Sequence, residues 1–304
     1  MRLLIRHGRK QSVKKTTTMT KQQARVAVIG GSGVYDIDGL ENKQAISLDT
    51  PWGKPSDDIL LGTMDGVDVA FLPRHGRGHF LSPSDVPYLA NIYALRQLGV
   101  QHVLTATAVG SLREHTPPGT FVFVDQYIDR TYRRRQTFFG DGVVAHVPMA
   151  DPVCAAMVDV LEGASQELDL NHHRGGTYVC IEGPQFSTRA ESEMFRAWGA
   201  DIIGMTNITE AKLIREAGMS FASIAMVTDF DCWHPDHEDV DVAQVIATAH
   251  RNAGNVVELL KMAVPRLGEL PDSEWRGVLD GAIMTARDAR DTGALLKVAA
   301  LLND

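Results

Sequence analysis

Short apolar runs alternate with amphipathic stretches along most of the chain, and this alternation limits the folds that it can adopt. The runs are rich in β-branched and aromatic residues, which is typical of buried strands. They lie at residues 26–29, 67–72, 103–106, 121–124, 178–181 and 221–227. Strands that alternate with helices predict an α/β fold around a largely central sheet.

Helices are expected where a capping residue or a proline precedes a stretch with apolar residues at helical spacing. Ser84 is the expected cap of one helix, and Asp151-Pro152 is the expected start of another. The expected helices cover residues 84–98, the stretch after 152, 209–218, 242–260 and, after a break between Pro265 and Pro271, an alanine-rich segment that reaches Asp304.

The charge pattern divides the chain unevenly. Residues 1–25 hold eight of the 30 Lys and Arg and none of the 38 Asp and Glu. We interpret them as a basic, disordered extension, with an organellar presequence as the alternative. Residues 26–270 are expected to form one catalytic domain, and residues 271–304 a helical appendage.

Without the basic head, the remaining chain has a formal charge of −16, which argues against binding to nucleic acid. No apolar run is long enough for a transmembrane helix. The three cysteines, Cys154, Cys180 and Cys232, form no CxxC pair, so neither a disulfide framework nor a cysteine zinc site is expected. A small-molecule substrate and a cytoplasmic location are therefore predicted.

Three segments at strand ends can hold an anion. The Gly30-Gly31-Ser32-Gly33 turn offers backbone N–H groups and the Ser32 hydroxyl, although Asp36 breaks the dinucleotide-binding fingerprint. Arg74 and His75 follow the 67–72 run, where Arg74 can give an oxyanion two parallel N–H bonds and His75 a third donor. Thr107 belongs to a third, hydroxyl-rich segment. A structural turn and a solvated basic loop remain alternatives.

Two carboxylates, Asp229 and Asp231, follow the 221–227 run. If the chain stays extended there, the two side chains point the same way. Neighbouring acids favour retention of a proton, which suits one of them as a proton donor. A helix cap or a solvent-facing turn are the structural alternatives.

Longer motifs add to these local patterns. They are Gly30-Gly31-Ser32-Gly33, Asp49-Thr50-Pro51, Arg74-His75-Gly76, Gly110-Ser111-Leu112-Arg113-Glu114, the run 181–189, Gly204-Met205-Thr206-Asn207 and Asp229-Phe230-Asp231-Cys232-Trp233. With these motifs the chain resembles, from about residue 26 to 267, the S-methyl-5′-thioadenosine phosphorylases, a family in the trimeric branch of the nucleoside phosphorylases.

The resemblance implies a single α/β domain with a mixed, distorted barrel-like sheet flanked by helices, assembled as a homotrimer with sites near the subunit interfaces. It implies phosphorolysis of 5′-methylthioadenosine to adenine and 5-methylthioribose 1-phosphate, in methionine and purine salvage. Inorganic phosphate is the co-substrate, and neither a metal nor an organic cofactor is expected.

The resemblance also assigns site residues. The phosphate ligands would be Ser32, Arg74, His75, Thr107, Ala108 through its N–H, and Thr206. Asp229 would protonate N7 and Asp231 would accept from the 6-amino group, although the two roles could be exchanged. The remaining substrate contacts would be Phe186 on the base, Ser187, Met205 against the ribose, and Val240, Val242 and a neighbouring subunit's His146 around the methylthio group.

Two other functions remain open at this stage. The nearest alternative is a purine nucleoside phosphorylase of broader or 6-oxo specificity. The sister family of 6-oxopurine nucleoside phosphorylases is expected to carry Glu and Asn where this chain has Ser187 and Asp229, and both differences favour a 6-aminopurine. A non-catalytic nucleoside-binding protein is the other. The Arg133-Arg134-Arg135 run is interpreted as a solvated or intersubunit cluster.

Overall fold

The computed structural model describes residues 23–30, 39–237 and 240–302. Eleven strands of this part form one mixed sheet. They are β1 (Val26–Gly30), β2 (Glu41–Ile46), β3 (Ile59–Met64), β4 (Val67–Pro73), β5 (His102–Ser111), β6 (Phe121–Phe123), β7 (Gln126–Arg130), β8 (His172–Arg174), β9 (Thr177–Ile181), β10 (Ile202–Gly204) and β11 (Ser220–Asp229). The mixed α/β fold expected from the sequence is confirmed.

The sheet divides at β5, which pairs with three strands. One edge of β5 pairs with parallel β11 from His102 to Gly110. The other edge is shared by β1, which is parallel to residues 102–105, and by β10, which is antiparallel to residues 110–111. The order β2-β3-β4-β1-β5-β10-β9-β7 runs through this edge, and β6 and β8 extend the sheet from β11. The carboxyl ends of β5 and β11 therefore lie together, whereas β1 ends beside the middle of β5.

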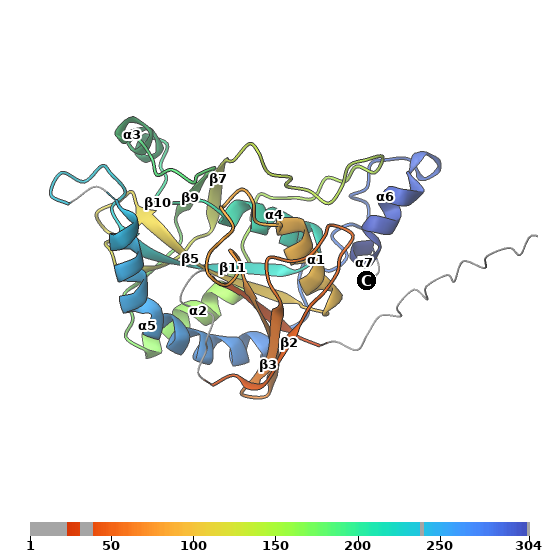
Figure 1. Cartoon of the computed structure of the whole chain (residues 1–304), viewed down its shortest axis with the longest axis horizontal. Helices are drawn as coiled ribbons and strands as arrows, with labels where there is room; N and C mark the ends of the chain where they lie inside the picture. The colour runs from red at the N-terminus through yellow and green to blue at the C-terminus, as the bar shows by residue number, and fades with distance from the viewer. Residues whose placement is uncertain (1–22, 31–38, 238–239, 303–304) are drawn as a thin grey trace, which may run out of the picture.

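Helices cover both faces of the central strands (Figure 1). Along β1, Val26 and Val28 belong to the core beneath α2 and α5, whereas Ala27 and Ile29 belong to the core beneath α1 and α4. This alternation explains why the whole strand is apolar. The helices are α1 (Tyr88–Gln97), α2 (Ala155–Glu167), α3 (Arg189–Ala197), α4 (Asn207–Glu216), α5 (Val242–Glu269), α6 (Thr292–Lys297) and α7 (Ala299–Leu302).

All six expected strands are present, as β1, β4, β5, β6, β9 and β11. Five strands were not expected, namely β2, β3, β7, β8 and β10, and three of them have weak patterns. The residues of β2 are mostly polar and exposed, and β8 and β10 have three residues each. Such strands form through pairing with neighbours that are distant in sequence, which local patterns do not reveal.

Two expected helix starts are wrong. Helix α1 begins at Tyr88, after Pro87, and Ser84 does not cap it because its hydroxyl donates to Glu182. Helix α2 begins at Ala155, because the preceding turn is held elsewhere: the Cys154 N–H donates to the Phe221 carbonyl at 2.8 Å.

The expected break at Pro265 is also wrong, because α5 continues through it to Glu269. Proline removes one backbone hydrogen bond from a helix. Burial of the apolar face offsets this loss, since Val264 and Leu267 on either side of Pro265 are fully buried. Among the described residues beyond α5, which end at 302, only α6 and α7 are α-helical. The rest of the described part of the expected appendage consists of turns and one short 3₁₀ segment.

Both chain ends of the expected domain contact the core. Ala24 is fully buried, and Arg25 donates to the carbonyls of Gly268 and Leu270 at 2.8 and 2.5 Å. The predicted extension therefore includes two residues that belong to the fold, while residues 1–22 lie outside the described part. The residues after α5 also add Leu279 to the core beneath α1.

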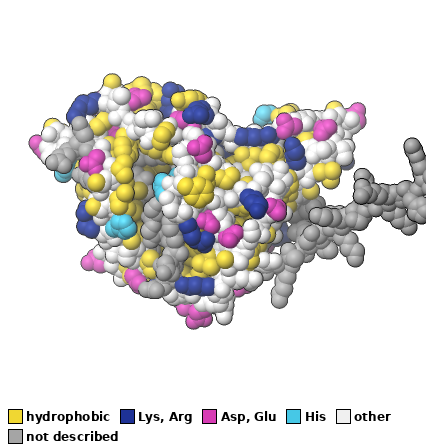
Figure 2. Space-filling model, in the orientation of Figure 1, with side chains coloured by type: hydrophobic (Ala, Val, Ile, Leu, Met, Phe, Trp, Pro, Cys, Tyr) yellow, Lys and Arg dark blue, Asp and Glu magenta, His cyan; other side chains and the backbone are white. Residues whose placement is uncertain are grey.

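The loop after β7 and the C-terminal segment lie side by side. Ala145 pairs with Ile283, and the Met284 N–H donates to the Val144 carbonyl at 2.9 Å. These two segments and α6 extend beyond the sheet at the right of Figure 1. On the face visible in Figure 2, acidic and basic side chains are interspersed rather than gathered into areas of one sign. No helix in the described ranges is long and apolar enough to cross a membrane.

Two glycines of α5 provide a matched test of how this helix packs on the sheet. A methyl group at Gly268 would lie 2.6 Å from Cγ2 of Val67, a stiff β-branched side chain on β4, whereas Gly254 has no heavy atom within 4 Å of that position. Because of this close approach, we expect Gly268→Ala to lower the free energy of unfolding by about 1–3 kcal/mol. We expect Gly254→Ala to raise it by up to about 1 kcal/mol, because alanine favours helix.

Thermal unfolding of both variants beside the parent protein checks this prediction. An equal shift of Tm in the two variants would contradict the packing of α5 on β4.

Candidate active site

The described parts of the predicted anion-binding segments lie where β1 and β4 end beside the middle of β5. Arg74 directly follows β4, and its guanidinium reaches both neighbouring strands. Its Nη1 donates to the Ala106 carbonyl of β5 at 3.0 Å, and its Nη2 donates to the Ile29 carbonyl of β1 at 3.4 Å. One buried side chain thus fixes the ends of β1 and β4 against the middle of β5.

The strongest partner of Arg74 is Glu210 on α4. Nε donates to Oε1 at 2.5 Å and Nη2 donates to Oε2 at 3.0 Å, and both side chains are 1% exposed. Burial alone would lower the pKa of Arg74, but the Glu210 carboxylate outweighs it and raises the pKa. The parallel N–H pair that was expected to hold an oxyanion therefore holds Glu210 instead.

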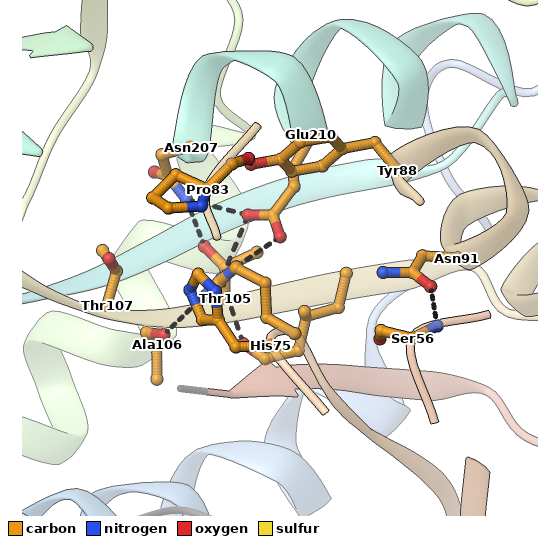
Figure 3. Close-up of polar contacts among 12 residues, drawn as sticks. Ser56, His75, Pro83, Tyr88, Asn91, Thr105, Ala106, Thr107, Asn207 and Glu210 are labelled. Atoms are coloured by element: carbon orange, nitrogen blue, oxygen red, sulfur yellow. Dashed lines mark hydrogen bonds and ion pairs between the residues drawn. The ribbon is translucent and has the colours of Figure 1, made fainter. Parts of the chain in front are cut away.

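Asn207 extends this polar network (Figure 3). Its Nδ2 donates to the Thr105 hydroxyl at 2.9 Å and to Glu210 Oε2 at 3.3 Å, and its Oδ1 accepts from the Tyr127 hydroxyl at 2.6 Å. Every group of the amide has a partner, which makes a buried network favourable rather than costly. The network connects α4 with β5 and β7.

His75 has only one ring nitrogen free to meet a ligand. Its Nδ1 lies 2.9 Å from the Leu81 carbonyl, which can only accept, so Nδ1 carries the proton. Burial, together with the charge of Arg74, lowers the pKa of His75 to about 4, so the ring is neutral at pH 7. Nε2 is then an acceptor, not the donor that the sequence analysis expected.

Thr206 lies directly before α4, and its side chain is buried. Among the described residues its hydroxyl has no hydrogen-bond partner, although the side chain is 4% exposed. The N-terminus of a helix also attracts anions. Thr107 and Ala108 follow Ala106 on β5 and are more open to solvent. Ser32 lies outside the described residues.

Asp229 and Asp231 form a buried pair, but not in the predicted extended geometry. Strand β11 ends at Asp229, and the chain turns at Asp231, which has a φ of +53°. The Asp231 N–H donates to Asp229 Oδ1 at 2.8 Å. Gly110 leaves room for both side chains, because a Cβ at this position would lie 2.9 Å from Asp229 Oδ1 and 3.5 Å from Cβ of Asp231.

Both carboxyl groups hold protons more tightly than exposed aspartates do. Burial raises the pKa of Asp229, against the opposing effects of the Thr228 hydroxyl and the Asp231 N–H. Burial also raises the pKa of Asp231, to about 6; the Ser192 hydroxyl opposes this rise and the Asp229 charge adds to it. The pair can therefore retain a proton close to neutral pH.

The predicted base-binding residues lie beside this pair. The Ser187 carbonyl accepts from the Cys232 thiol at 3.4 Å, next to Asp231. Phe186 is 40% exposed, so its ring is available to a ligand. The Val240 N–H donates to the Asp231 carbonyl at 3.2 Å, which brings one of the predicted 5′ residues to the same place.

Two predicted residues lie in more open positions. His146 is on the loop after β7, where its N–H donates to the Ala282 carbonyl at 3.0 Å. Val242 begins α5 and is 62% exposed. The described contacts of this single chain do not connect His146 with Asp229 or Arg74.

Met205 is held by residues whose role the sequence did not reveal. Arg134 has a 1% exposed side chain and donates to the Met205 carbonyl and, at 2.7 Å, to the Glu182 carbonyl. The Glu182 carboxylate in turn accepts from the Tyr132 N–H at 2.7 Å. The expectation that Arg134 belongs to a solvated or intersubunit cluster is therefore wrong.

Comparison with known proteins identifies the class. Residues 25–264 match the model of the Phosphorylase superfamily. The chain is 53% identical over 284 residues to S-methyl-5′-thioadenosine phosphorylase of Rhodospirillum rubrum, covering 92% of this chain and 96% of the relative. The chain therefore belongs to the phosphorylase superfamily.

Similarity to solved structures shows which family of the superfamily the chain belongs to. A methylthioadenosine phosphorylase from an antarctic soil metagenomic library superposes with a TM-score of 0.88 at 50% identity, covering 93% of this chain and all of that one. Methylthioadenosine phosphorylase from Schistosoma mansoni, solved with adenine, gives a TM-score of 0.82 at 37% identity, covering 86% and 99%. Within the superfamily, the chain belongs to the S-methyl-5′-thioadenosine phosphorylases.

The buried Arg74–Glu210 pair predicts a large stability effect. In Glu210→Gln the carboxylate is lost and the Arg74 charge stays buried, which costs about 3–5 kcal/mol. Glu167→Gln is the matched control, because Arg266 also makes two 2.8 Å bonds to Glu167, but on the surface. Exposed pairs contribute little.

Thermal unfolding compares the two substitutions. A fall in Tm for Glu210→Gln that does not exceed the fall for Glu167→Gln would contradict the role of the buried pair.

The raised pKa of Asp231 predicts a stability that depends on pH. The folded state holds a proton on Asp231 up to about pH 6, whereas the unfolded chain releases it near pH 4. Ionisation of Asp231 in the folded state therefore lowers the free energy of unfolding as pH rises from 4 through 6. The loss is about 2–3 kcal/mol at pH 7. Asp231→Asn should therefore be more stable than the parent at pH 7.

The difference in Tm between parent and Asp231→Asn, measured from pH 4 to 8, checks the sign. It should shrink towards zero as pH falls to 4. A difference that is constant with pH would contradict the raised pKa.

Proposed function

We propose that this protein is an enzyme that converts 5′-methylthioadenosine and phosphate to adenine and 5-methylthioribose 1-phosphate. The observation that carries this function is the short distance between the buried aspartate pair and the candidate anion site. Both lie along β5. Gly110 of β5 faces Asp229 and Asp231, and Thr107 precedes it by three residues. This spacing is about 10 Å, which leaves room for a ribose between phosphate and base.

The phosphate is proposed to bind at Arg74, His75, Thr107, Ala108, Thr206 and Ser32. The Thr206 hydroxyl, which has no hydrogen-bond partner in the described part of the chain, and the α4 N-terminus support this assignment. With its parallel N–H pair on Glu210, Arg74 would contact phosphate through Nη1. The neutral His75 would accept, through Nε2, from a hydroxyl group of the phosphate. Such a rigid site holds the nucleophile beneath C1′ and stabilises the positive charge that develops on the ribose.

Departure of adenine requires a proton, and Asp229 is proposed to supply it. As phosphate oxygen bonds to C1′, the C1′–N9 bond breaks and its electrons pass into the base. The proton moves from the Asp229 carboxyl to N7, which leaves neutral adenine and a carboxylate. The raised pKa of Asp229 supports this role, since the acid must still carry a proton near neutral pH.

Selection of a 6-aminopurine is assigned to Asp231, with Phe186 against the base. A carboxylate accepts from the 6-amino group, whereas a 6-oxo group would place its oxygen against it. The hydrogen bond from the Cys232 thiol to the Ser187 carbonyl holds Ser187 next to Asp231, which supports its assignment to the same pocket. Ser187 and Asp229 favour this function over a 6-oxopurine nucleoside phosphorylase, the second candidate.

The 5′ end is proposed to lie in an apolar pocket formed by Val240, Val242 and His146 of a neighbouring subunit, with Met205 against the ribose. The exposure of Val242 supports an arrangement that a second chain completes. A homotrimer is therefore proposed. The enzyme would use neither a metal nor an organic cofactor and would act in the cytoplasm, in methionine and purine salvage.

Release of free base from 5′-methylthioadenosine, adenosine and inosine, with and without phosphate, tests this function. We expect phosphate-dependent adenine release, fastest from the thioether substrate, and no reaction with inosine, because the Asp231 carboxylate opposes a 6-oxo group. An apolar pocket distinguishes a methylthio from a hydroxyl group only modestly, by about 10- to 200-fold.

Each other outcome points to an alternative. Preference for inosine would favour the 6-oxopurine phosphorylase. Binding of the nucleosides without turnover would favour a nucleoside-binding protein.

A further inference from the structure

The hydroxyl of Thr228, the residue before the proposed acid, lies between two acceptors. Its Oγ1 is 2.7 Å from Asp229 Oδ2 and 3.2 Å from the Val109 carbonyl of β5, and the side chain is 2% exposed. A hydroxyl has one hydrogen, so it can donate to only one of these oxygens at a time. Rotation about the Cβ–Oγ1 bond exchanges them without moving any heavy atom.

The two acceptors differ in what they gain from this hydrogen. The Val109 carbonyl is always neutral, whereas Asp229 changes from a neutral acid to a carboxylate when it gives up its proton. A hydrogen bond to a charged group contributes more than one between neutral groups. The preferred position of the Thr228 hydrogen therefore depends on the protonation state of Asp229.

We propose that Thr228 is a positioning residue whose hydroxyl turns from the Val109 carbonyl to Asp229 Oδ2 as the acid delivers its proton to the leaving base. This inference rests on the proposed function of Asp229. The proton of Asp229 moves to N7, and the Thr228 hydrogen stays on Oγ1 and only changes its acceptor. The hydroxyl thus stabilises a charge that forms in the transition state, which is how an interaction accelerates a reaction.

The surroundings of Asp229 contain few other groups that could do this. Gly110 of β5 lies close to Asp229 Oδ1, and Ile203 of β10 packs beside Gly110. Neither of these residues has a titratable side chain. Oδ1 already accepts the Asp231 N–H at 2.8 Å, a bond that is the same before and after proton transfer. Asp231 is the titratable neighbour and, as a carboxylate, would oppose a second negative charge. This leaves the Thr228 hydroxyl as the described group that can respond.

Thr228→Val tests the inference, because valine has the same shape without the hydroxyl. We expect kcat for 5′-methylthioadenosine at saturating phosphate to fall about 10- to 100-fold, as expected for loss of one hydrogen bond to a developing charge. Both KM values should change by less than about threefold, since the hydroxyl contacts neither substrate in this mechanism.

The pH profile separates this role from a structural one. Activity requires protonated Asp229, so it falls as pH rises through the pKa of that group. Loss of a donor to the carboxylate raises the pKa, and the high-pH limb of the kcat profile should move to higher pH in Thr228→Val. Thr228→Ala should move it the same way if the valine variant folds poorly. Thr228→Ser keeps the hydroxyl and should restore the parent profile.

Two further variants make the result specific. Thr120→Val removes another buried hydroxyl, which accepts from Asn171 Nδ2 at 2.9 Å. Thr120 also lies against β11, because its carbonyl accepts from the Val227 N–H at 3.0 Å. This variant should keep the parent profile. Asp229→Asn should lose most turnover while retaining its Tm.

The inference is overturned if Thr228→Val and Thr228→Ala keep the parent kcat and profile while Asp229→Asn is inactive; the acid assignment then stands. It is also overturned if Thr120→Val reproduces the loss, because strand disturbance then explains it. Parent-like turnover of Asp229→Asn would instead remove the proposed acid itself.

Discussion

The buried ion pair between Arg74 and Glu210 is the interaction on which the site depends. It joins the residue after β4 to α4, and the same guanidinium bonds to the carbonyls of Ile29 and Ala106 on β1 and β5. Burial of an unpaired charge is costly, so these elements must come together in one arrangement for either charge to be tolerated. The cost of burying these two charges is offset because the guanidinium N–H groups and the carboxylate oxygens lie near hydrogen-bond partners.

Helix α4 makes buried polar contacts along its whole length. Thr206 and Asn207 stand at its beginning, Glu210 contacts Arg74, and Glu216 near its end accepts from the Thr137 hydroxyl at 2.6 Å and the Phe138 N–H at 2.7 Å. The last contact anchors the loop that leads to His146. One helix therefore connects the candidate phosphate site to a segment that is proposed to complete a neighbouring active site.

Much of this architecture could be predicted from sequence, because the strongest patterns belong to the most buried elements. All six expected strands are present, and α4 ends at Glu216, just before Gly218, whose φ of +69° suits the end of a helix. The failures have physical reasons. Ser84 has the composition of a helix cap but bonds to Glu182, and Pro265 lies within α5 because packing outweighs one lost hydrogen bond. Local patterns do not report such distant contacts.

The sequence by itself determined the class of fold, the strand ends that carry polar groups and the family, because periodicity and ordered motifs are local properties of the chain. Only the tertiary structure decided how those groups are used. It placed Glu210 on the parallel N–H pair of Arg74, turned Asp231 back towards Asp229, and buried Arg134 beneath Met205. Each residue type has a fixed charge and hydrogen-bonding capacity. Its partners and its degree of burial, which set its pKa and the orientation of its side chain, arise only when distant segments pack together.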